Sequence, residues 1–409
     1  MSSETNQVHG SDSASERVDT RKFLERLVNV PSPVSDQNAV RAAQAVFAME
    51  LQKLGFRFAW RRDPAAKTDD LLVAELPGHE ARWITLVSHV DTVLDVKDTG
   101  RFRLEGDFAY GSGVLDNKGG LCVMLKALDY ALAPSTKRRF GIRVVSSPDE
   151  EAGSAAWHKI FADLGRDSVA VLGFEPALDE GHVISSRRGN RWYDIELRGI
   201  EAHAGRCRGE EINAAHEAAD MITRLIALRD ELRTRFGDGV NLHVGHLAGG
   251  RDRHNIVCGR MTIKLDTRFT NFQEREALHA GVEKILKTPR FSNREGRFTE
   301  VEFKVVDDCP PFDLSQVQEH QAWVDQLCSR ISAIEGRPIE ARKAGGAGDV
   351  NHMSRESLFV IDGLGPVGQG MHTLGESVRI SSLDPRARAV AELLDLIDQN
   401  AKATSSAHI

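Results

Sequence analysis

The stretch from Trp83 to Asp91 constrains the fold of this chain more than any other. Residues 83–88 are mostly β-branched or apolar, a pattern typical of a strand that is buried on both faces of a parallel sheet. The run ends in His89 and Asp91. In open α/β sheets, ligands bind beyond the carboxyl ends of the strands, so these two side chains are predicted to lie at the functional edge of the sheet.

Three later apolar runs and one glycine-containing loop also lead to acidic side chains or to a histidine. With His89 and one residue from each of these four segments, the chain offers five potential metal ligands at the ends of sheet elements, a pattern that packing alone does not require. The segments with the residues they lead to are 141–147 with Glu150 and Glu151, 169–174 with Glu175, 358–361 with His372, and the loop 111–120 with Asp116.

Length and composition restrict the class of protein. A chain of 409 residues is long for a single hydrophobic core, so two domains are expected. A net charge of -7 and a pI near 6.1 leave no large basic field, which argues against nucleic acid as a partner. No run reaches the ~18 apolar residues of a membrane helix, so no membrane association is expected. The five cysteines lack CxxC pairing and the amino terminus lacks a signal peptide, which favours a reducing cytoplasm.

The order of predicted elements divides the chain into an α/β domain and an insertion. Strands interleaved with helices predict a mostly parallel sheet in a catalytic domain formed by residues 17–188 and 307–409. Residues 189–306 instead show the order βαββαβ, the ferredoxin-like split βαβ arrangement of a small separate domain. Residues 1–16 are rich in Ser, Asn and acidic residues and are expected to be disordered.

Each candidate ligand also has an ordinary structural explanation. His89 alone would be interpreted as a core histidine, but Asp91 is placed to fix the tautomer of a ligating histidine. Glu150 and Glu151 precede a predicted helix, whose positive end favours acidic residues. Glu175 is harder to explain, because a buried carboxylate is costly unless a cation or donors meet it. Histidine and carboxylate ligands without thiolates suit Zn²⁺, with Mn²⁺ or Co²⁺ as substitutes.

Taken together, these motifs resemble the di-zinc carboxypeptidase and aminoacylase family that includes carboxypeptidase G, succinyl-diaminopimelate desuccinylase and acetylornithine deacetylase. The matching segments run through most of the chain in the family's order, and the predicted insertion has the expected place. Each segment is weak alone, but the set is highly specific. The segments are 88–93 (SHVDTV), 111–120 (GSGVLDNKGG), 149–154 (DEEAGS), 174–176 (FEP), 201–205 (EAHAG) and 370–373 (GMHT).

The resemblance implies a metal-dependent hydrolase that cleaves an amide-type C–N bond. Asp116 would bridge two divalent metal ions, and Glu150 would act as the general base for a metal-bridging water and later as the proton donor. Asp91 would orient His89. The implied ligands are His89 and Glu175 for one metal, and Glu151 and His372 for the other.

The resemblance also implies contributions from the insertion, as a lid and dimerisation domain. His203, which alone would be interpreted as a surface turn histidine, would reach the active site of the partner subunit and stabilise the oxyanion, with Asn255 in support. Arg268 would bind a substrate carboxylate, a contact that a guanidinium can make bidentately. The expected catalytic unit is therefore a homodimer that acts on a small molecule with an amide and a carboxylate.

Two departures from the family pattern leave the substrate open. Cys309 precedes Pro310-Pro311-Phe312, where glutamate-releasing relatives carry an arginine, and Ala344 to Gly348 replaces their Thr-Gly-Gly-Gly run. The favoured substrate is a peptide or an N-acyl amino acid, as for a carboxypeptidase. The alternative is a non-peptide C–N bond, such as that of an aryl amide or arylamine.

A dinucleotide-binding protein and a non-catalytic binding protein are less favoured. Residues 363–368 (GLGPVG) match the fingerprint G-x-G-x-x-G, which requires a helix to follow. Residues 369–375 contain two more glycines and no helical apolar period, so the match is interpreted as accidental. A non-catalytic protein on the same scaffold is disfavoured because every matched catalytic position is filled.

Overall fold

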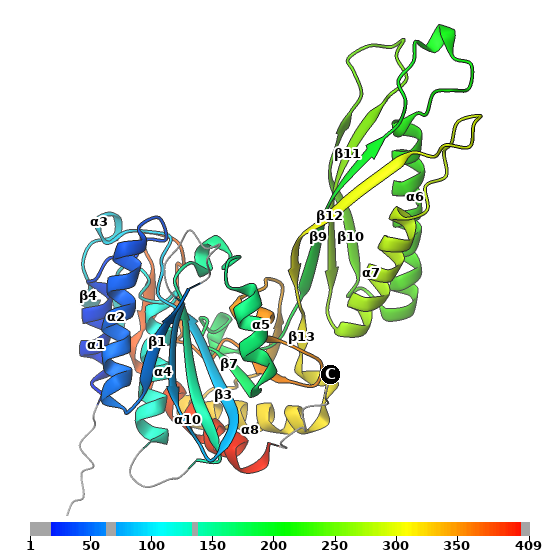
Figure 1. The fold of residues 1–409 in the computed structure, drawn as a ribbon. Helices are drawn as coiled ribbons and strands as arrows, with labels where there is room; N and C mark the ends of the chain where they lie inside the picture. The colour runs from blue at the N-terminus through cyan, green and yellow to red at the C-terminus, as the bar shows by residue number, and fades with distance from the viewer. Residues whose placement is uncertain (1–17, 63–70, 133–137, 402–409) are drawn as a thin grey trace, which may run out of the picture.

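The computed structural model describes residues 18–62, 71–132 and 138–401 of the chain. The predicted disordered tail, residues 1–16, lies outside the described residues. Figure 1 shows two parts, a larger one in which helices surround a sheet and a smaller one made of a sheet with two helices. No helix within the described ranges has both the length and the apolar character needed to cross a membrane.

The larger part is built on a six-stranded sheet with the strand order β1-β2-β6-β3-β7-β15. The four strands β6, β3, β7 and β15 pair in parallel, whereas β1 and β2 are antiparallel additions at one edge. Three of the candidate site residues, His89, Glu151 and Glu175, follow parallel strands of this sheet. The bounds are β1 (Arg57–Arg61), β2 (Leu71–Leu76), β3 (Glu80–His89), β6 (Phe140–Ser147), β7 (Ser168–Gly173) and β15 (Phe359–Ile361).

Helices cover both faces of this sheet (Figure 1). Side chains alternate across a strand, so Leu86 of β3 packs into one hydrophobic cluster and Val87 into another on the opposite face. A strand in this position needs consecutive apolar residues, which explains the uninterrupted run before His89. The first cluster includes α1 (Thr20–Val28), α2 (Gln37–Lys53), α4 (Lys118–Ala131), α8 (Gln318–Glu335) and α10 (Leu383–Asn400), and the second includes α5 (His158–Arg166) and α9 (Asp349–Met353).

A small four-stranded sheet of order β16-β17-β5-β4 holds two site-bearing loops together. The loop after β5 carries Asp116, and the loop between β16 and β17 carries His372. Tyr110 of β5 pairs with Ser377 of β17, so both loops are anchored at neighbouring positions. The bounds are β4 (Arg103–Glu105), β5 (Phe108–Tyr110), β16 (Gly368–Gln369) and β17 (Ser377–Arg379).

A second small sheet, of order β13-β8-β14, lies where the chain passes between the two parts. Short helices complete the larger part. The bounds are α3 (Val96–Thr99), β8 (Val183–Arg187), β13 (Phe312–Asp313) and β14 (Ala341–Ala344), with 3-10 helices η1 (Glu150–Ala152), η2 (Asp179–Gly181), η4 (Leu314–Gln316) and η5 (Ile380–Ser382).

The smaller part is an antiparallel sheet of order β10-β11-β9-β12 with two helices on one face (Figure 1). Tyr193, Ile195 and Leu197 pack in its hydrophobic cluster, whereas Asp194 and Glu196 between them point to the open face. The predicted dimerisation role and domain boundaries stay predictions. The elements are β9 (Gly189–Arg198), η3 (Ala204–Arg206), α6 (Ala214–Phe236), β10 (Asn241–Gly249), β11 (Arg260–Phe269), α7 (Phe272–Leu286) and β12 (Glu300–Cys309).

Candidate metal centre

His89 is held at the end of β3 by a neighbouring carboxylate. Its side chain is buried, and Nδ1 lies 3.2 Å from Oδ1 of Asp91 and 3.1 Å from the Asp91 carbonyl oxygen. The second carboxylate oxygen of Asp91 accepts a 3.0 Å hydrogen bond from the backbone N–H of Glu151. These contacts favour the tautomer in which Nδ1 carries the proton, which leaves Nε2 of His89 available to a metal.

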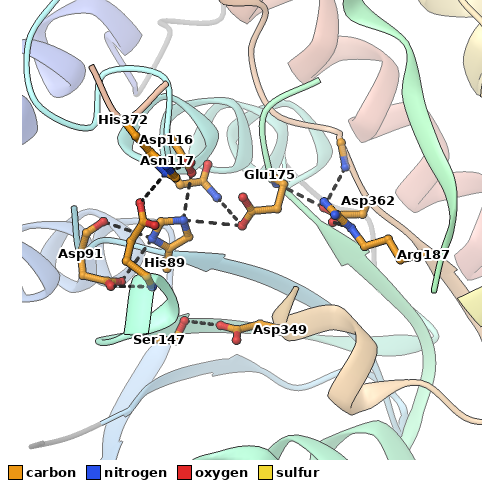
Figure 2. Close-up of polar contacts among 12 residues, drawn as sticks. His89, Asp91, Asp116, Asn117, Ser147, Glu175, Arg187, Asp349, Asp362 and His372 are labelled. Atoms are coloured by element: carbon orange, nitrogen blue, oxygen red, sulfur yellow. Dashed lines mark hydrogen bonds and ion pairs between the residues drawn. The ribbon is translucent and has the colours of Figure 1, made fainter. Parts of the chain in front are cut away.

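Asp116 lies between the two candidate histidine ligands (Figure 2). One of its carboxylate oxygens is 3.1 Å from Nε2 of His89, and the other is 3.2 Å from Nε2 of His372. Nε2 of His372 is also 3.1 Å from Oε1 of Glu151, and Nε2 of His89 is 3.6 Å from Oε1 of Glu175. Five residues from separate segments of the chain thus meet, and we call them the metal-site cluster.

The acidic side chains of this cluster are crowded and largely buried. Burial raises the pKa of Glu151 to about 6, opposed by His89. Burial also raises the pKa of Glu175 well above its usual value, again opposed by His89. Burial by itself would lower the pKa of His89, but the negative charge of Glu175 and hydrogen bonds to the carboxylates of Asp116 and Asp91 raise it. Buried acids with so little compensating charge indicate a site for a cation.

The donor atoms fit a divalent metal ion. One ligand atom from each of His89, Asp116 and Glu151 lies within 4.8 Å of the others. Oε1 of Glu151 is buried and makes no hydrogen bond, although Nε2 of His372 lies 3.1 Å away. Nitrogen and oxygen donors without thiolates are compatible with Zn²⁺.

Glu150 opens the short helix η1 beside Glu151 and faces a different environment. Burial raises its pKa to about 8, and the carboxylates of Asp349 and Asp116 add to the shift while His89 opposes it. Asp349 is itself buried and accepts a hydrogen bond from the hydroxyl of Ser147 (Figure 2). A carboxyl group with a pKa near neutrality can both accept and return a proton.

A buried ion pair supports the backbone at Glu175, and sequence analysis missed both of its residues (Figure 2). Oδ1 of Asp362 accepts hydrogen bonds from the backbone N–H groups of Glu175 at 3.3 Å and Gly363 at 2.7 Å. Arg187, at the end of β8, donates from Nε to the other oxygen of Asp362 at 2.7 Å. Asp362 follows an apolar strand just as Glu175 does, so the same strand-end rule identifies it. Arg187 carries no comparable signal.

Glu376 connects the two loops that carry Asp116 and His372, and sequence analysis missed it too. Its carboxylate accepts hydrogen bonds from the backbone N–H groups of Gly113 at 3.0 Å, Leu115 at 2.8 Å and Asp116 at 3.0 Å. The side chain is buried, which raises its pKa against the effect of these three donors. Glu376 follows His372 closely in the chain, so one carboxylate fixes the spacing of the two loops.

Three predicted site residues lie in the smaller part. His203 and Asn255 are exposed and contact each other, with 3.2 Å between Nε2 and Nδ2. Nε of Arg268 is 2.9 Å from Oδ1 of Asp266, so its guanidinium is already paired. Within the described part of the chain, no hydrogen bond or ion pair joins these three predicted residues to the metal-site cluster.

The chain is similar to known proteins over most of its length. The sequence model of Peptidase family M20/M25/M40 matches residues 85–396. Carboxypeptidase G2 from Pseudomonas sp. (strain RS-16) is 26% identical over 379 residues, which cover 91% of this chain and 88% of that protein. Succinyl-diaminopimelate desuccinylase from Magnetococcus marinus is 23% identical over 337 residues, covering 78% and 84%. The crystal structure of aminopeptidase PepT from Bacillus cereus has a TM-score of 0.65 at 18% identity, covering 93% and 99%, which shows a shared fold.

Proposed function

The chain belongs to Peptidase family M20/M25/M40, and we propose that this metal-dependent hydrolase of C–N bonds cleaves a peptide or an N-acyl amino acid with two divalent metal ions. The arrangement of Asp116 carries the proposal. Its two oxygens face different histidines, His89 at 3.1 Å and His372 at 3.2 Å, as a carboxylate shared by two metals would. When bound, the metals supply Lewis acidity and activate a water.

The residues of the metal-site cluster divide into two ligand sets in this proposal. His89 with Glu175 forms one set, and Glu151 with His372 forms the other, with Asp116 common to both. The contacts of 3.6 Å between His89 and Glu175 and 3.1 Å between His372 and Glu151 support this division. Zinc is the proposed metal, with cobalt or manganese as substitutes, because all the donors are nitrogen or carboxylate oxygen.

Glu150 is the proposed general base. It is not needed as a ligand, and burial raises its pKa to about 8, which suits a group that takes a proton from water near neutral pH. The same group would then return the proton to the leaving nitrogen. Asp91 has the role of orienting His89, since its carboxylate lies 3.2 Å from Nδ1 of that ring.

The smaller part is proposed to act in a homodimer. His203 and Asn255 are exposed and paired with each other, so both are accessible to a second subunit, where they would stabilise the oxyanion. Arg268 would bind a substrate carboxylate after exchanging its contact with Asp266. A cytoplasmic location belongs to the same proposal and is supported by the cysteines, all five of which are free thiols.

The leaving group has a second candidate, the amine of an aryl amide or another arylamine. Cys309 favours it, because this buried thiol lines a cavity together with Glu150 and stands where glutamate-releasing relatives carry an arginine. The chemistry at the metal-site cluster is the same for both candidates.

The proposal is tested by metal analysis combined with turnover. The full chain, purified without chelator, should contain zinc, cobalt or manganese and should hydrolyse N-acyl amino acids, dipeptides or aryl amides. Treatment with a chelator should abolish turnover, and each metal added back should restore it to a characteristic level. A chain that binds none of these metals and hydrolyses none of these compounds would overturn the proposal.

A further inference from the structure

A cavity of about 200 Å³ is lined by Glu150 and by no residue of the metal-site cluster. Its walls come from both parts of the molecule. Gly348 and Asp349 line it from the larger part, and Asn190, Asp307 and Cys309 line it from the strands β9 and β12 that lead into the smaller part. A group attached to a substrate amide beside Glu150 would therefore enter this cavity.

The walls carry three carboxyl groups and two histidines. Glu150, Asp307 and Asp349 contribute carboxyl groups, and no lysine or arginine is among the residues that line the cavity. Burial lowers the pKa of His352 to about 3, so this imidazole is uncharged at neutral pH. Burial raises the pKa of the Cys309 thiol, which is also uncharged. A carboxylate placed here would meet these carboxyl groups and no lysine or arginine of the cavity wall.

Two arginines that interact electrostatically with residues of the cavity are already paired. Burial raises the pKa of Cys309, and the positive charge of Arg268 opposes this shift. Nε of Arg268 lies 2.9 Å from Oδ1 of Asp266. Nε of Arg187 donates to Asp362 at 2.7 Å in a buried ion pair. Recruiting Arg187 into the cavity would leave the buried Asp362 without its partner, which is costly.

Asp307 supplies the acceptor of the cavity. Its carboxylate accepts a hydrogen bond from the side-chain amide of Asn190, which fixes its position on β12. A carboxylate has several lone-pair sites, so this contact leaves capacity for a donor from a substrate. The cavity also has room for a compact group, since an engineered protein cavity of about 150 Å³ holds a benzene ring.

We propose that this cavity selects a compact substrate group that bears a positively charged nitrogen, and discriminates against a carboxylate of similar length. Asp307 accepts the hydrogen bond from that nitrogen. The inference rests on the proposed amide hydrolysis and names the class of substrate for the same site.

Matched substrates test the charge preference. The enzyme, in the metal form that hydrolyses Ala-Ala fastest, is assayed with Lys-Ala, Gln-Ala and Glu-Ala, and with Ala-Lys, Ala-Gln and Ala-Glu. Acetanilides with a para-aminomethyl or a para-carboxylate group extend the comparison to aryl amides. In at least one series, kcat/KM for the cationic member should exceed that for the anionic member by roughly tenfold or more, the scale of discrimination by a single pocket contact.

The variant Asp307→Asn identifies the group responsible. It keeps an oxygen for the amide of Asn190 but removes the charge, so the ratio of cationic to anionic substrate should fall toward one. Asp308→Asn is the matched control, because Asp308 pairs with Arg191 and Arg275, each at 2.7 Å, and does not line the cavity. The control should keep the wild-type ratio. Thermal melting of both variants checks that each is folded.

The outcomes separate this inference from the proposed function. If the enzyme prefers the anionic substrate in every series, the proposed selectivity of the cavity is wrong and amide hydrolysis still stands. The same conclusion follows if Asp307→Asn leaves the ratio of kcat/KM for cationic to anionic substrates unchanged. Hydrolysis of none of these compounds by any metal form overturns the inference, and it overturns the proposed function as well if the chain also binds no metal and hydrolyses no N-acyl amino acid. If Asp308→Asn lowered this kcat/KM ratio as much as Asp307→Asn does, the preference would come from the overall electrostatic potential of the region. The specific role of Asp307 would then be wrong.

Discussion

The two large sheets of this molecule treat acidic side chains in opposite ways. On the open face of the four-stranded sheet, Asp194 lies 3.4 Å from the ammonium of Lys264 and 3.5 Å from that of Lys304. At the carboxyl end of the six-stranded sheet, Asp116 and Glu151 gather around histidines instead, with no lysine or arginine among their ion pairs in the described chain. Charges that are balanced on a wet surface need no further explanation, whereas unbalanced acids at a buried sheet end indicate a site for a cation.

Among the acidic residues at the end of the six-stranded sheet, substitution of Glu150 should have the largest effect on turnover. Glu150→Gln keeps the shape of the side chain but removes the proton acceptor, so kcat should fall by about 10² or more. Metal content should not change, because the proposed ligands are other residues. The measurements are steady-state kinetics and metal analysis by mass spectrometry of the purified variant.

Glu151→Gln is the matched control for this prediction. It makes the same chemical change one position further along η1, but it removes a proposed ligand that lies 3.1 Å from His372. This variant should lose both metal and turnover. If Glu150→Gln also lost metal, Glu150 would be a ligand, and the division of the acids into base and ligands would be wrong.

A smaller effect is expected at Glu376, which acts on the site through the backbone. Glu376→Gln replaces one acceptor oxygen with an NH₂ group, which would face an N–H donor of the Asp116 loop. Loss of outer contacts of this kind costs about 10- to 100-fold in metal affinity. Competition with a chromophoric chelator measures that affinity. Glu25→Gln, on the exposed surface of α1, is the control and should bind metal like the wild type. Equal affinities for the two variants would contradict the role of Glu376.

The two sheets also differ in how many of their faces are buried, and this difference explains which strands could be predicted from the sequence. The apolar run before His89 and the alternation around Tyr193 predicted two kinds of strand, because burial of both faces or of one face leaves different patterns. The parallel-strand rule then predicted that the residues following such strands meet, and the structure brings His89, Glu151 and Glu175 together. That their roles are those of metal ligands stays a prediction.

The sequence alone could not identify the residues that position the metal-site cluster through hydrogen bonds without belonging to it. Glu376 reaches N–H groups of Gly113, Leu115 and Asp116 that precede it by 260 to 263 positions, and Arg187 reaches Asp362 across 175 positions. These contacts depend on how two loops or two sheets approach each other in space. No periodicity or local motif records such an approach, and an isolated glutamate in a loop is ordinarily solvated.

The smallest effect is expected on the open sheet face, where Lys264→Ala tests the other half of the comparison. The Lys264 side chain is 65% exposed, and Asp194 keeps Lys304 as a second partner. The free energy of unfolding should therefore change by less than about 0.5 kcal/mol, and kcat/KM should not change. Urea denaturation and steady-state kinetics measure both. A loss several times larger would show that this face is not a wet surface in solution, because a charge pair has that much influence only where water is excluded. The sheet would then be covered, and the proposed homodimer would be the first candidate for what covers it.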